Sequence, residues 1–198
     1  MSTASASPVV VELFASQNCA ACPKAHRTLE TVSETRDDVL VLTWSVDYWD
    51  YLGEDDPMAM PESKARQAAY VERFKLRGPY TPQSVYNGEK QCPGNRPRDV
   101  ENNLEDVARH DGVAFAYDDG QLMISGDVPG PVEIWLVHFI PQLETEAAMV
   151  TNAVTSVTRL MEWQGASSLG IPVACDDGCA VLVQDAGYGS IRGAMRLH

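Results

Sequence analysis

The feature that most constrains the fold is a pair of cysteines with two residues between them, Cys19-Ala-Ala-Cys22, placed between an apolar run and a helical pattern. Residues 9–14 are mostly apolar, which predicts a buried strand. A helix is expected to follow, with Pro23 near its start, where a missing N–H costs little. Residues 39–46 form a second apolar run. The chain therefore opens β-α-β, an order that favours parallel strands joined by a right-handed crossover.

The mixed pattern continues to about residue 112. The signals, in order, are a helix over residues 62–76, a strand over 83–86, an Asn87-Gly88 turn, a return strand over 90–92 and a helix over 97–110. Asn-Gly between two short strands is a strong hairpin signal, because both residues tolerate a positive φ. These elements complete the expected α/β sheet with flanking helices.

Beyond residue 112 the signals are for strands alone. Strand-like runs cover residues 113–117, 121–125, 132–140, 154–163, 180–184 and 191–197. The sequence therefore predicts a flexible N-terminal segment over residues 1–8, an α/β domain over 9–112 and a β-rich extension over 113–198 packed on it.

The position of the cysteine pair favours thiol–disulfide chemistry. We expect Cys19 at the helix N-terminus, where free N–H groups and the helix dipole favour a thiolate. That thiolate attacks, and Cys22 then resolves the mixed disulfide. Two alternatives are a pair of buried core cysteines and part of a metal site. In the metal alternative, Cys19, Cys22 and His26 hold copper or zinc, whereas the simpler interpretation of His26 is a solvated helix residue.

Thr81-Pro82 stands directly before the third predicted strand. In a thioredoxin fold, a proline at this point commonly carries a cis peptide bond and places its neighbour's backbone against the cysteine pair. Cis bonds are almost confined to X–Pro. The order of Cys-x-x-Cys, helix, Thr-Pro, strand, hairpin and helix favours this interpretation over a trans proline in a loop. We therefore expect Pro82 to belong to the catalytic site and Thr81 to contact substrate.

Several motifs resemble those of a bacterial thioredoxin-like family of unknown function, most of whose members are secreted. The matching segments are residues 9–23, Asp47-Tyr-Trp-Asp-Tyr-Leu-Gly53, Asp56-Pro57, Arg66-Gln67, Tyr80-Thr-Pro-Gln83, Val181-Leu-Val-Gln184 and Gly193-Ala-Met-Arg-Leu197. The resemblance covers almost the whole chain and implies a thioredoxin-like fold for residues 9–112. His26 stands where the family commonly has a carboxylate, and Cys92, Cys175 and Cys179 lie outside the matched motifs.

Four more residues are candidates for the site. Glu12 lies near the position of a buried carboxylate in thioredoxins, and we expect it to accept a proton from the second cysteine. The alternative is an exposed glutamate on an edge strand. Asp47, Tyr48 and Trp49 follow the second strand, and ligand sites form beyond the carboxyl ends of parallel strands. We expect Tyr48 or Trp49 to hold an apolar peptide and Asp47 to bias proton transfer; the alternative is a structural plug.

Composition and cysteine usage bear on partners and location. A formal net charge of -13 disfavours nucleic acid and anionic lipid as partners. No apolar run approaches the length of a membrane span, and residues 1–8 carry no secretory signal. We expect a periplasmic or secreted mature form, with a cytoplasmic protein as the alternative. Cys175 and Cys179 fit a local disulfide in an oxidising compartment, which leaves Cys92 over.

Two functions are consistent with these residues. The first is a thiol–disulfide oxidoreductase that acts on protein or small-molecule thiols through the Cys19–Cys22 pair and needs no organic cofactor. The second is a non-catalytic thioredoxin-fold binding protein, or a copper or zinc carrier, that uses the same cysteines.

Overall fold

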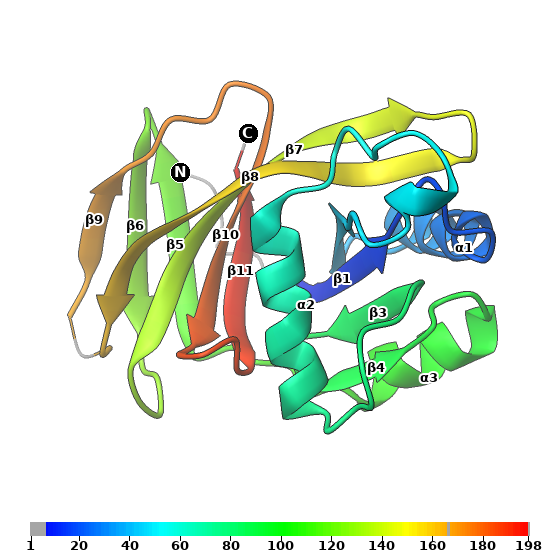
Figure 1. Cartoon of the computed structure of the whole chain (residues 1–198). Helices are drawn as coiled ribbons and strands as arrows, with labels where there is room; N and C mark the ends of the chain where they lie inside the picture. The colour runs from blue at the N-terminus through cyan, green and yellow to red at the C-terminus, as the bar shows by residue number, and fades with distance from the viewer. Residues whose placement is uncertain (1–6, 166, 198) are drawn as a thin grey trace.

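The first half of the chain builds one end of a large mixed sheet and, among the described residues, the helices that flank it (Figure 1). In the computed structural model, which describes residues 7–165 and 167–197, its elements are β1 (Val9–Ala15), α1 (Cys22–Thr35), β2 (Val39–Ser45), the short 3-10 helix η1 (Asp50–Leu52), α2 (Pro61–Arg73), β3 (Gln83–Tyr86), β4 (Lys90–Cys92) and α3 (Pro97–Asp106). Strands β1 and β2 are parallel, β3 is antiparallel to β1, and β4 is antiparallel to β3.

The second half adds strands. They are β5 (Val113–Asp118), β6 (Gln121–Gly126), β7 (Val132–Glu144), β8 (Met149–Trp163), β9 (Leu169–Pro172), β10 (Gly178–Asp185) and β11 (Ile191–Leu197). Four of them extend the first half's sheet to eight strands, in the order β11-β10-β7-β8-β2-β1-β3-β4, while β5, β6 and β9 form a second sheet. The change expected near residue 112 is thus a change of element type, and the large sheet runs across it. Of the expected flexible segment 1–8, residues 1–6 lie outside the described residues.

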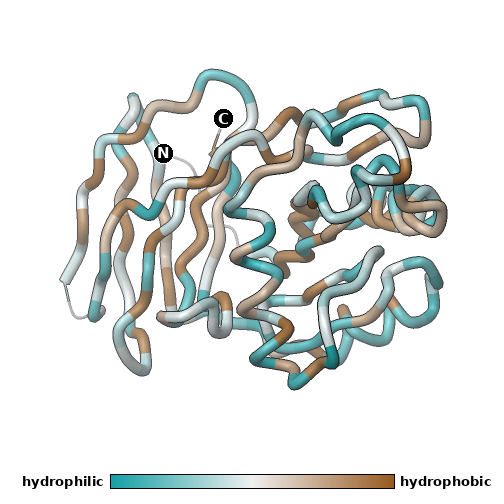
Figure 2. The backbone as a smooth tube through the Cα atoms, viewed as in Figure 1, coloured by the Kyte–Doolittle hydropathy of each residue, from teal (hydrophilic) through white to brown (hydrophobic). Residues whose placement is uncertain are grey.

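Both faces of the large sheet are packed. One face carries α2, and its cluster includes Phe14, Trp44 and Tyr70. The opposite face is covered by α1 and α3 over the first-half strands and by the three-stranded sheet over β7, β10 and β11. Hydrophobic residues recur along the strands between these layers, as the brown segments of the backbone show (Figure 2). None of the described helices has the length and apolar character that a membrane span needs.

The observed helices and strands differ from the predicted ones in two kinds of place: where the strand residues are exposed, and where a turn precedes a helix. Helix α1 begins at Cys22, so Cys19 lies in the preceding turn and the expectation that it starts the helix is wrong. Strands β7 and β8 run past their expected ends near residues 140 and 154 into a long hairpin. Most residues of this extension are exposed or half-buried, so no apolar alternation marks it. Strand β9 alternates between half-buried and exposed residues and gave no signal either.

Candidate functional site

Cys19 and Cys22 form a disulfide between the carboxyl end of β1 and the start of α1. Their Cα atoms are 5.4 Å apart, and the backbone N–H of Cys22 donates to the carbonyl oxygen of Cys19 at 3.0 Å. A single tight turn therefore sets the spacing of the pair. Cys19 is 5% exposed and Cys22 is 1% exposed. Cys19 is thus the more accessible of the two to an incoming thiol.

Hydrogen bonds join the turn before the disulfide to the loop that precedes α2. Asp56 accepts the backbone N–H of Gln17 with one carboxylate oxygen, at 2.9 Å, and that of Met58 with the other, at 3.0 Å. The side-chain amide of Asn18 donates to the carbonyl oxygen of Glu54 at 2.8 Å, and that of Gln17 reaches the same oxygen at 3.1 Å. Because Gln17 and Asn18 directly precede the first cysteine, these bonds fix how the chain approaches the disulfide.

Trp49, Thr81 and Pro82 lie at the same end of the sheet as the cysteine pair. The peptide bond between Thr81 and Pro82 is cis, as expected from the sequence. Gln83, the next residue, pairs with Phe14 near the carboxyl end of β1, where the turn to the disulfide begins. Trp49 Nε1 donates to Thr81 Oγ1 at 2.7 Å, and Trp49 packs against the cluster that contains both cysteines. This tryptophan therefore links the Thr-Pro loop to the core cluster that contains the disulfide.

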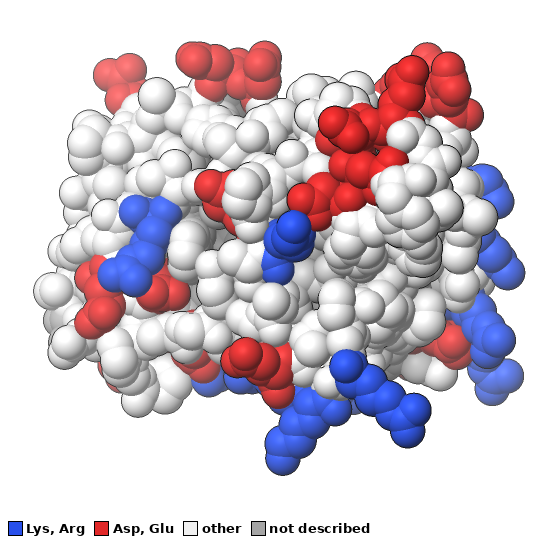
Figure 3. Space-filling model, viewed as in Figure 1, with Lys and Arg blue, Asp and Glu red and all other residues white. Residues whose placement is uncertain are grey.

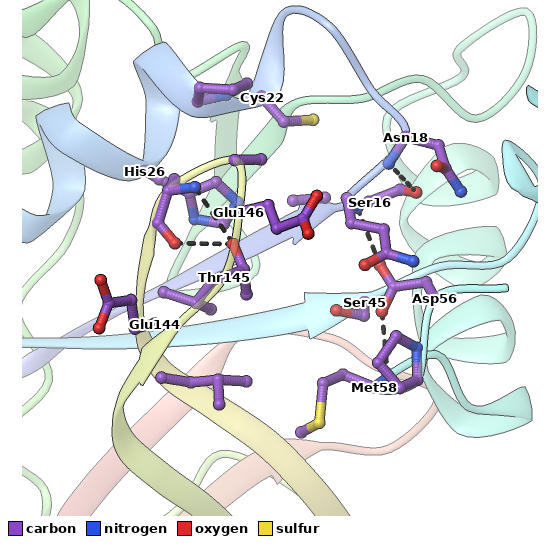
Figure 4. A pocket seen from close by; sticks show the side chains of 18 of the residues that line it. Ser16, Asn18, Cys22, His26, Ser45, Asp56, Met58, Glu144, Thr145 and Glu146 are labelled. Carbon is purple, nitrogen blue, oxygen red and sulfur yellow. Dashed lines mark hydrogen bonds between the residues drawn. The ribbon is translucent and has the colours of Figure 1, made fainter. Parts of the chain in front are cut away.

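A cavity of about 780 Å³ opens beside the disulfide (Figure 4). Its walls are the turn after β1, the start of α1 including Cys22, the loop before α2 and the tip of the β7–β8 hairpin. Its described lining includes the carboxylates of Glu54, Asp56, Glu144 and Glu146 and no Lys or Arg. Figure 3 shows acidic side chains gathered over this part of the molecule, at the upper right of the view. The cavity is therefore negatively charged and shares a wall with the disulfide.

His26 forms part of the inner wall of this cavity. Figure 4 places it between α1 and the hairpin residues Thr145 and Glu146. It is 8% exposed, and its Nδ1 has no hydrogen-bond partner within the described residues. Burial lowers the pKa of the imidazole to about 4, so the ring is neutral near pH 7. His26 is therefore not the solvated helix residue considered from the sequence.

The hairpin tip is the part of the site that sequence analysis missed. Glu144, Thr145 and Glu146 reach the cavity because β7 and β8 extend past the sheet. Thr145 Oγ1 donates to the carbonyl oxygen of Ala148 at 2.7 Å and accepts its backbone N–H at 3.1 Å, which closes the tip. The sequence shows two glutamates on either side of a threonine between two strand-like runs. That pattern does not predict which other part of the chain these residues lie against.

Glu12 lies on the other face of the sheet from the cysteines. Its buried carboxylate accepts hydrogen bonds from Arg66 Nε and the Tyr70 hydroxyl of α2. Arg66 also donates to Gln184 Oε1 on β10 at 2.8 Å. Neighbouring β1 side chains on either side of Glu12 join the cysteine cluster, and successive residues of a strand alternate between faces. Glu12 is thus buried, as one of the two interpretations expected, and the exposed alternative is wrong; its carboxylate faces α2 and not the cysteine cluster.

The three residues that follow β2 do not form one site. Trp49 reaches the cysteine cluster, as described above. Tyr48 instead packs against the cluster under α2, and burial raises the pKa of its phenol. Asp47 is exposed and pairs with Lys64 Nζ of α2 at 3.0 Å. Asp47 therefore has a partner on α2, while the Tyr48 ring lies with its centroid 6.0 Å from that of Trp49, so a substrate contact by Tyr48 or Trp49 stays a prediction.

The metal alternative for Cys19, Cys22 and His26 is not supported by their placement. The two cysteines are joined in a disulfide. Across residues 7–165 and 167–197, no group of three His, Cys, Asp or Glu side chains is arranged to hold a metal ion.

The remaining cysteines lie away from this site in the sequence and behave as expected. Cys175 and Cys179 form a second disulfide with their Cα atoms 5.9 Å apart. Cys92 is a free, buried thiol, with Ser84 Oγ and Tyr86 Oη each 3.4 Å from its Sγ. A protein with two disulfides fits an oxidising compartment, where such bonds persist.

The fold and the site define a mixed α/β protein with a strand-rich sheet, three α-helices and a Cys-x-x-Cys disulfide within its described part. Residues 10–184 match the model of a family described as a protein of unknown function (DUF1223), and the chain belongs to that family. The predicted membership in a family of unknown function is confirmed. No curated protein matches the chain.

Two solved structures resemble it. The X-ray crystal structure of a protein from Agrobacterium tumefaciens is 29% identical, covers 98% of this chain and 95% of its own, and has a TM-score of 0.82. The structure of HBP35 of Porphyromonas gingivalis is 12% identical, covers 97% of this chain and 75% of its own, and has a TM-score of 0.66. The second similarity is one of fold alone.

Proposed function

We propose that the chain is a thiol–disulfide oxidoreductase whose Cys19–Cys22 pair exchanges disulfides with protein or small-molecule thiols. The observation that carries the proposal is the disulfide between β1 and α1, in which Cys19 is the more accessible cysteine. Free backbone N–H groups at a helix N-terminus stabilise the thiolate that forms when such a pair opens. Two disulfides in one chain also favour a periplasmic or secreted location.

We further propose that the first half of the chain is a thioredoxin-like core. The strand order β2-β1-β3-β4 supports this, with β1 and β2 parallel and the others antiparallel. The cis bond at Thr81-Pro82 before β3 supports it as well, as does the position of the cysteine pair after β1. In this arrangement Pro82 and Thr81 present backbone to the substrate, and Trp49, bonded to Thr81 and packed on the cysteine cluster, offers an apolar surface.

The exchange follows from the accessibility of the two cysteines. A substrate thiolate attacks Sγ of Cys19, a new S–S bond forms, and Cys22 leaves as a thiolate. A second substrate thiolate attacks the substrate sulfur of this mixed disulfide, and Cys19 leaves as a thiolate. The substrate dithiol loses two electrons and becomes a disulfide. The two sulfurs of the protein disulfide gain those electrons and become thiolates, which take up protons from water. The reverse sequence begins with attack by the Cys19 thiolate and reduces a substrate disulfide.

The test is the redox equilibrium of the Cys19–Cys22 pair. The full chain is equilibrated with dithiothreitol buffers for the reducing range and glutathione buffers for the oxidising range, free thiols are alkylated, and each cysteine is quantified by peptide mass spectrometry. Mapping by residue separates this pair from Cys175–Cys179 and Cys92 without removing them. A potential near about −270 mV indicates a reductant, and one near about −120 mV an oxidant.

A matched pair of variants checks the assigned roles. Cys22→Ser lacks the resolving thiol and is expected to accumulate a mixed disulfide through Cys19. Cys19→Ser is expected to accumulate much less, because the remaining thiol is more deeply buried. A wild-type pair that no thiol reduces at any potential contradicts the proposed function.

A further inference from the structure

We infer that the cavity beside Cys22 receives a positively charged segment of a substrate polypeptide, so that the exchange favours cysteines flanked by Lys or Arg. This inference rests on the proposed thiol–disulfide function and names the substrate class of that site. Three independent observations support it: the position of the cavity, its charge and an unpaired buried histidine.

The position of the cavity suits residues that flank a reacting cysteine. Cys22 and Pro23 line it, so the disulfide and the cavity share the first turn of α1. A polypeptide joined to Cys19 through its own cysteine therefore has neighbouring side chains within reach of the cavity. Its volume of about 780 Å³ lies within the range of ordinary ligand sites.

The charge of the cavity is negative and unneutralised. Glu54, Glu144 and Glu146 are exposed, and within residues 7–165 and 167–197 none of them pairs with Lys, Arg or His. Asp56 differs, because its two oxygens already accept backbone N–H groups. Three free carboxylates around one opening attract a cationic side chain and raise the rate at which it arrives.

The lining also suits the rest of a Lys or Arg side chain. Pro57, Met58 and Val150 give the cavity an apolar surface for the methylene stem. His26 is more than nine-tenths buried in the inner wall, with Nδ1 unpaired within the described residues. A polar group buried in this way normally has a partner, so a small turn of the imidazole toward the cavity would let Nδ1 bond to a bound peptide. Since the ring is neutral near pH 7, it does not cancel the carboxylate charge.

The test compares two short peptides that each contain one cysteine, flanked either by lysines or by glutamates. Each peptide is reacted with the oxidised full chain, and reduction of the Cys19–Cys22 disulfide is followed by alkylation and mass spectrometry. Flanking charges also change the reactivity of the peptide thiol itself. Each rate is therefore divided by the same peptide's rate with hydroxyethyl disulfide, which is neutral. We expect a normalised preference of about 10-fold or more for the lysine peptide at low ionic strength, falling as salt is added.

Two triple variants with the same change in net charge locate the effect. Glu54→Gln/Glu144→Gln/Glu146→Gln removes the free carboxylates of the cavity. The control, Asp111→Asn/Asp127→Asn/Glu162→Gln, alters exposed residues that do not line it. The preference for the lysine peptide is expected to fall to within about 2-fold in the first variant and to persist in the control.

The outcomes separate this inference from the proposed function. If dithiothreitol reduces the pair but the wild type shows no charge preference, the inference is overturned and thiol exchange stands. Equal loss of preference in both triple variants also overturns it, because the effect then belongs to net charge and not to the cavity. A pair that neither dithiothreitol nor either peptide reduces overturns both.

Discussion

Glu12 is a fully buried carboxylate whose charge is matched by Arg66, which is 1% exposed and stacks over the Trp44 ring at 5.1 Å. Replacing Glu12 by Gln leaves a buried guanidinium without its counter-charge. We expect Glu12→Gln to lower the free energy of unfolding by about 3–5 kcal/mol, the cost of breaking a buried ion pair from one side. Urea denaturation at pH 7 measures this change.

The double variant Glu12→Gln/Arg66→Met is the control, because it removes both charges and keeps much of the side-chain volume. It is expected to recover most of the lost stability. The rate at which Cys22 leaves as a thiolate, when a substrate thiol attacks Cys19, depends on pH. This pH dependence is expected to stay the same in Glu12→Gln, since the carboxylate of Glu12 faces α2. A shift in that profile would show that Glu12 acts on the cysteine pair after all.

Neither the face of β1 on which Glu12 lies nor its partner could be predicted from the sequence. All seven residues of β1 are buried, so the strand carries no alternation from which its two faces can be told apart. Its partner Arg66 is 54 positions away, and nothing local to either residue predicts the pairing. A buried carboxylate needs a cation. That rule predicts a partner for Glu12 but does not say which one.

His26 makes stability depend on pH. Burial lowers its folded-state pKa to about 4, whereas an unfolded histidine titrates near about 6.5. As pH falls below about 6.5, the unfolded chain binds a proton that the folded chain does not, so stability is lost until about pH 4. The loss amounts to about 3 kcal/mol. Between pH 7 and pH 4, the free energy of unfolding of His26→Gln is expected to fall by that much less than that of the wild type, measured by urea unfolding. Equal losses in the two proteins would contradict this assignment.

At the scale of elements, hydrogen bonds between the turn before Cys19 and the loop before α2 position the disulfide. Asp56→Asn keeps one acceptor oxygen but loses the other, so one of the bonds to Gln17 and Met58 is broken. We expect a loss of about 1–2 kcal/mol and faster amide exchange at one of these two residues. Asp55→Asn is the matched control, because only the backbone carbonyl of Asp55 takes part in these hydrogen bonds. Equal effects of the two substitutions would show that charge, and not this bond, matters.

The elements themselves were predicted best where one face is buried and the period is clear. The helix after Cys22 and the strands at 83–86 and 90–92 formed close to expectation, because apolar spacing and the Asn87-Gly88 turn mark them directly. The β7–β8 hairpin tip carries no such mark. Its extension is held by backbone pairing between the two strands, such as Leu143 with Val150, and its side chains show no apolar alternation. The cavity depends on this tip and was therefore not predicted from the sequence. The cysteine pair was predicted, because its spacing and position are local features.

Across the whole molecule, the two halves of the large sheet meet where β2 and β8 adjoin. Thr43 pairs with Ala153, and its hydroxyl donates to the carbonyl oxygen of Thr151 at 2.7 Å. The side-chain amide of Asn152 donates to the carbonyl oxygen of Val41 at 2.6 Å. The core under α2 also draws on both halves, from strands β1, β2 and β3 and from β7, β8, β10 and β11. Of the three core clusters in the described residues, the one under α2 is therefore shared by the two halves of the chain.

A shared core predicts that the two halves fold together. A fragment of residues 1–112 would expose the edge of β2 and the side chains of Leu40, Leu42 and Trp44 that face the second half across the α2 cluster. We expect this fragment to lack a cooperative unfolding transition, and the full chain to unfold in a single step. Native-state hydrogen exchange measures the second point, because amides of β1 and β10 would then open with the same free energy. A fragment that unfolds cooperatively and retains the redox potential of its cysteine pair would instead establish residue 112 as a true domain boundary, with the β-rich half as an independent addition to the site.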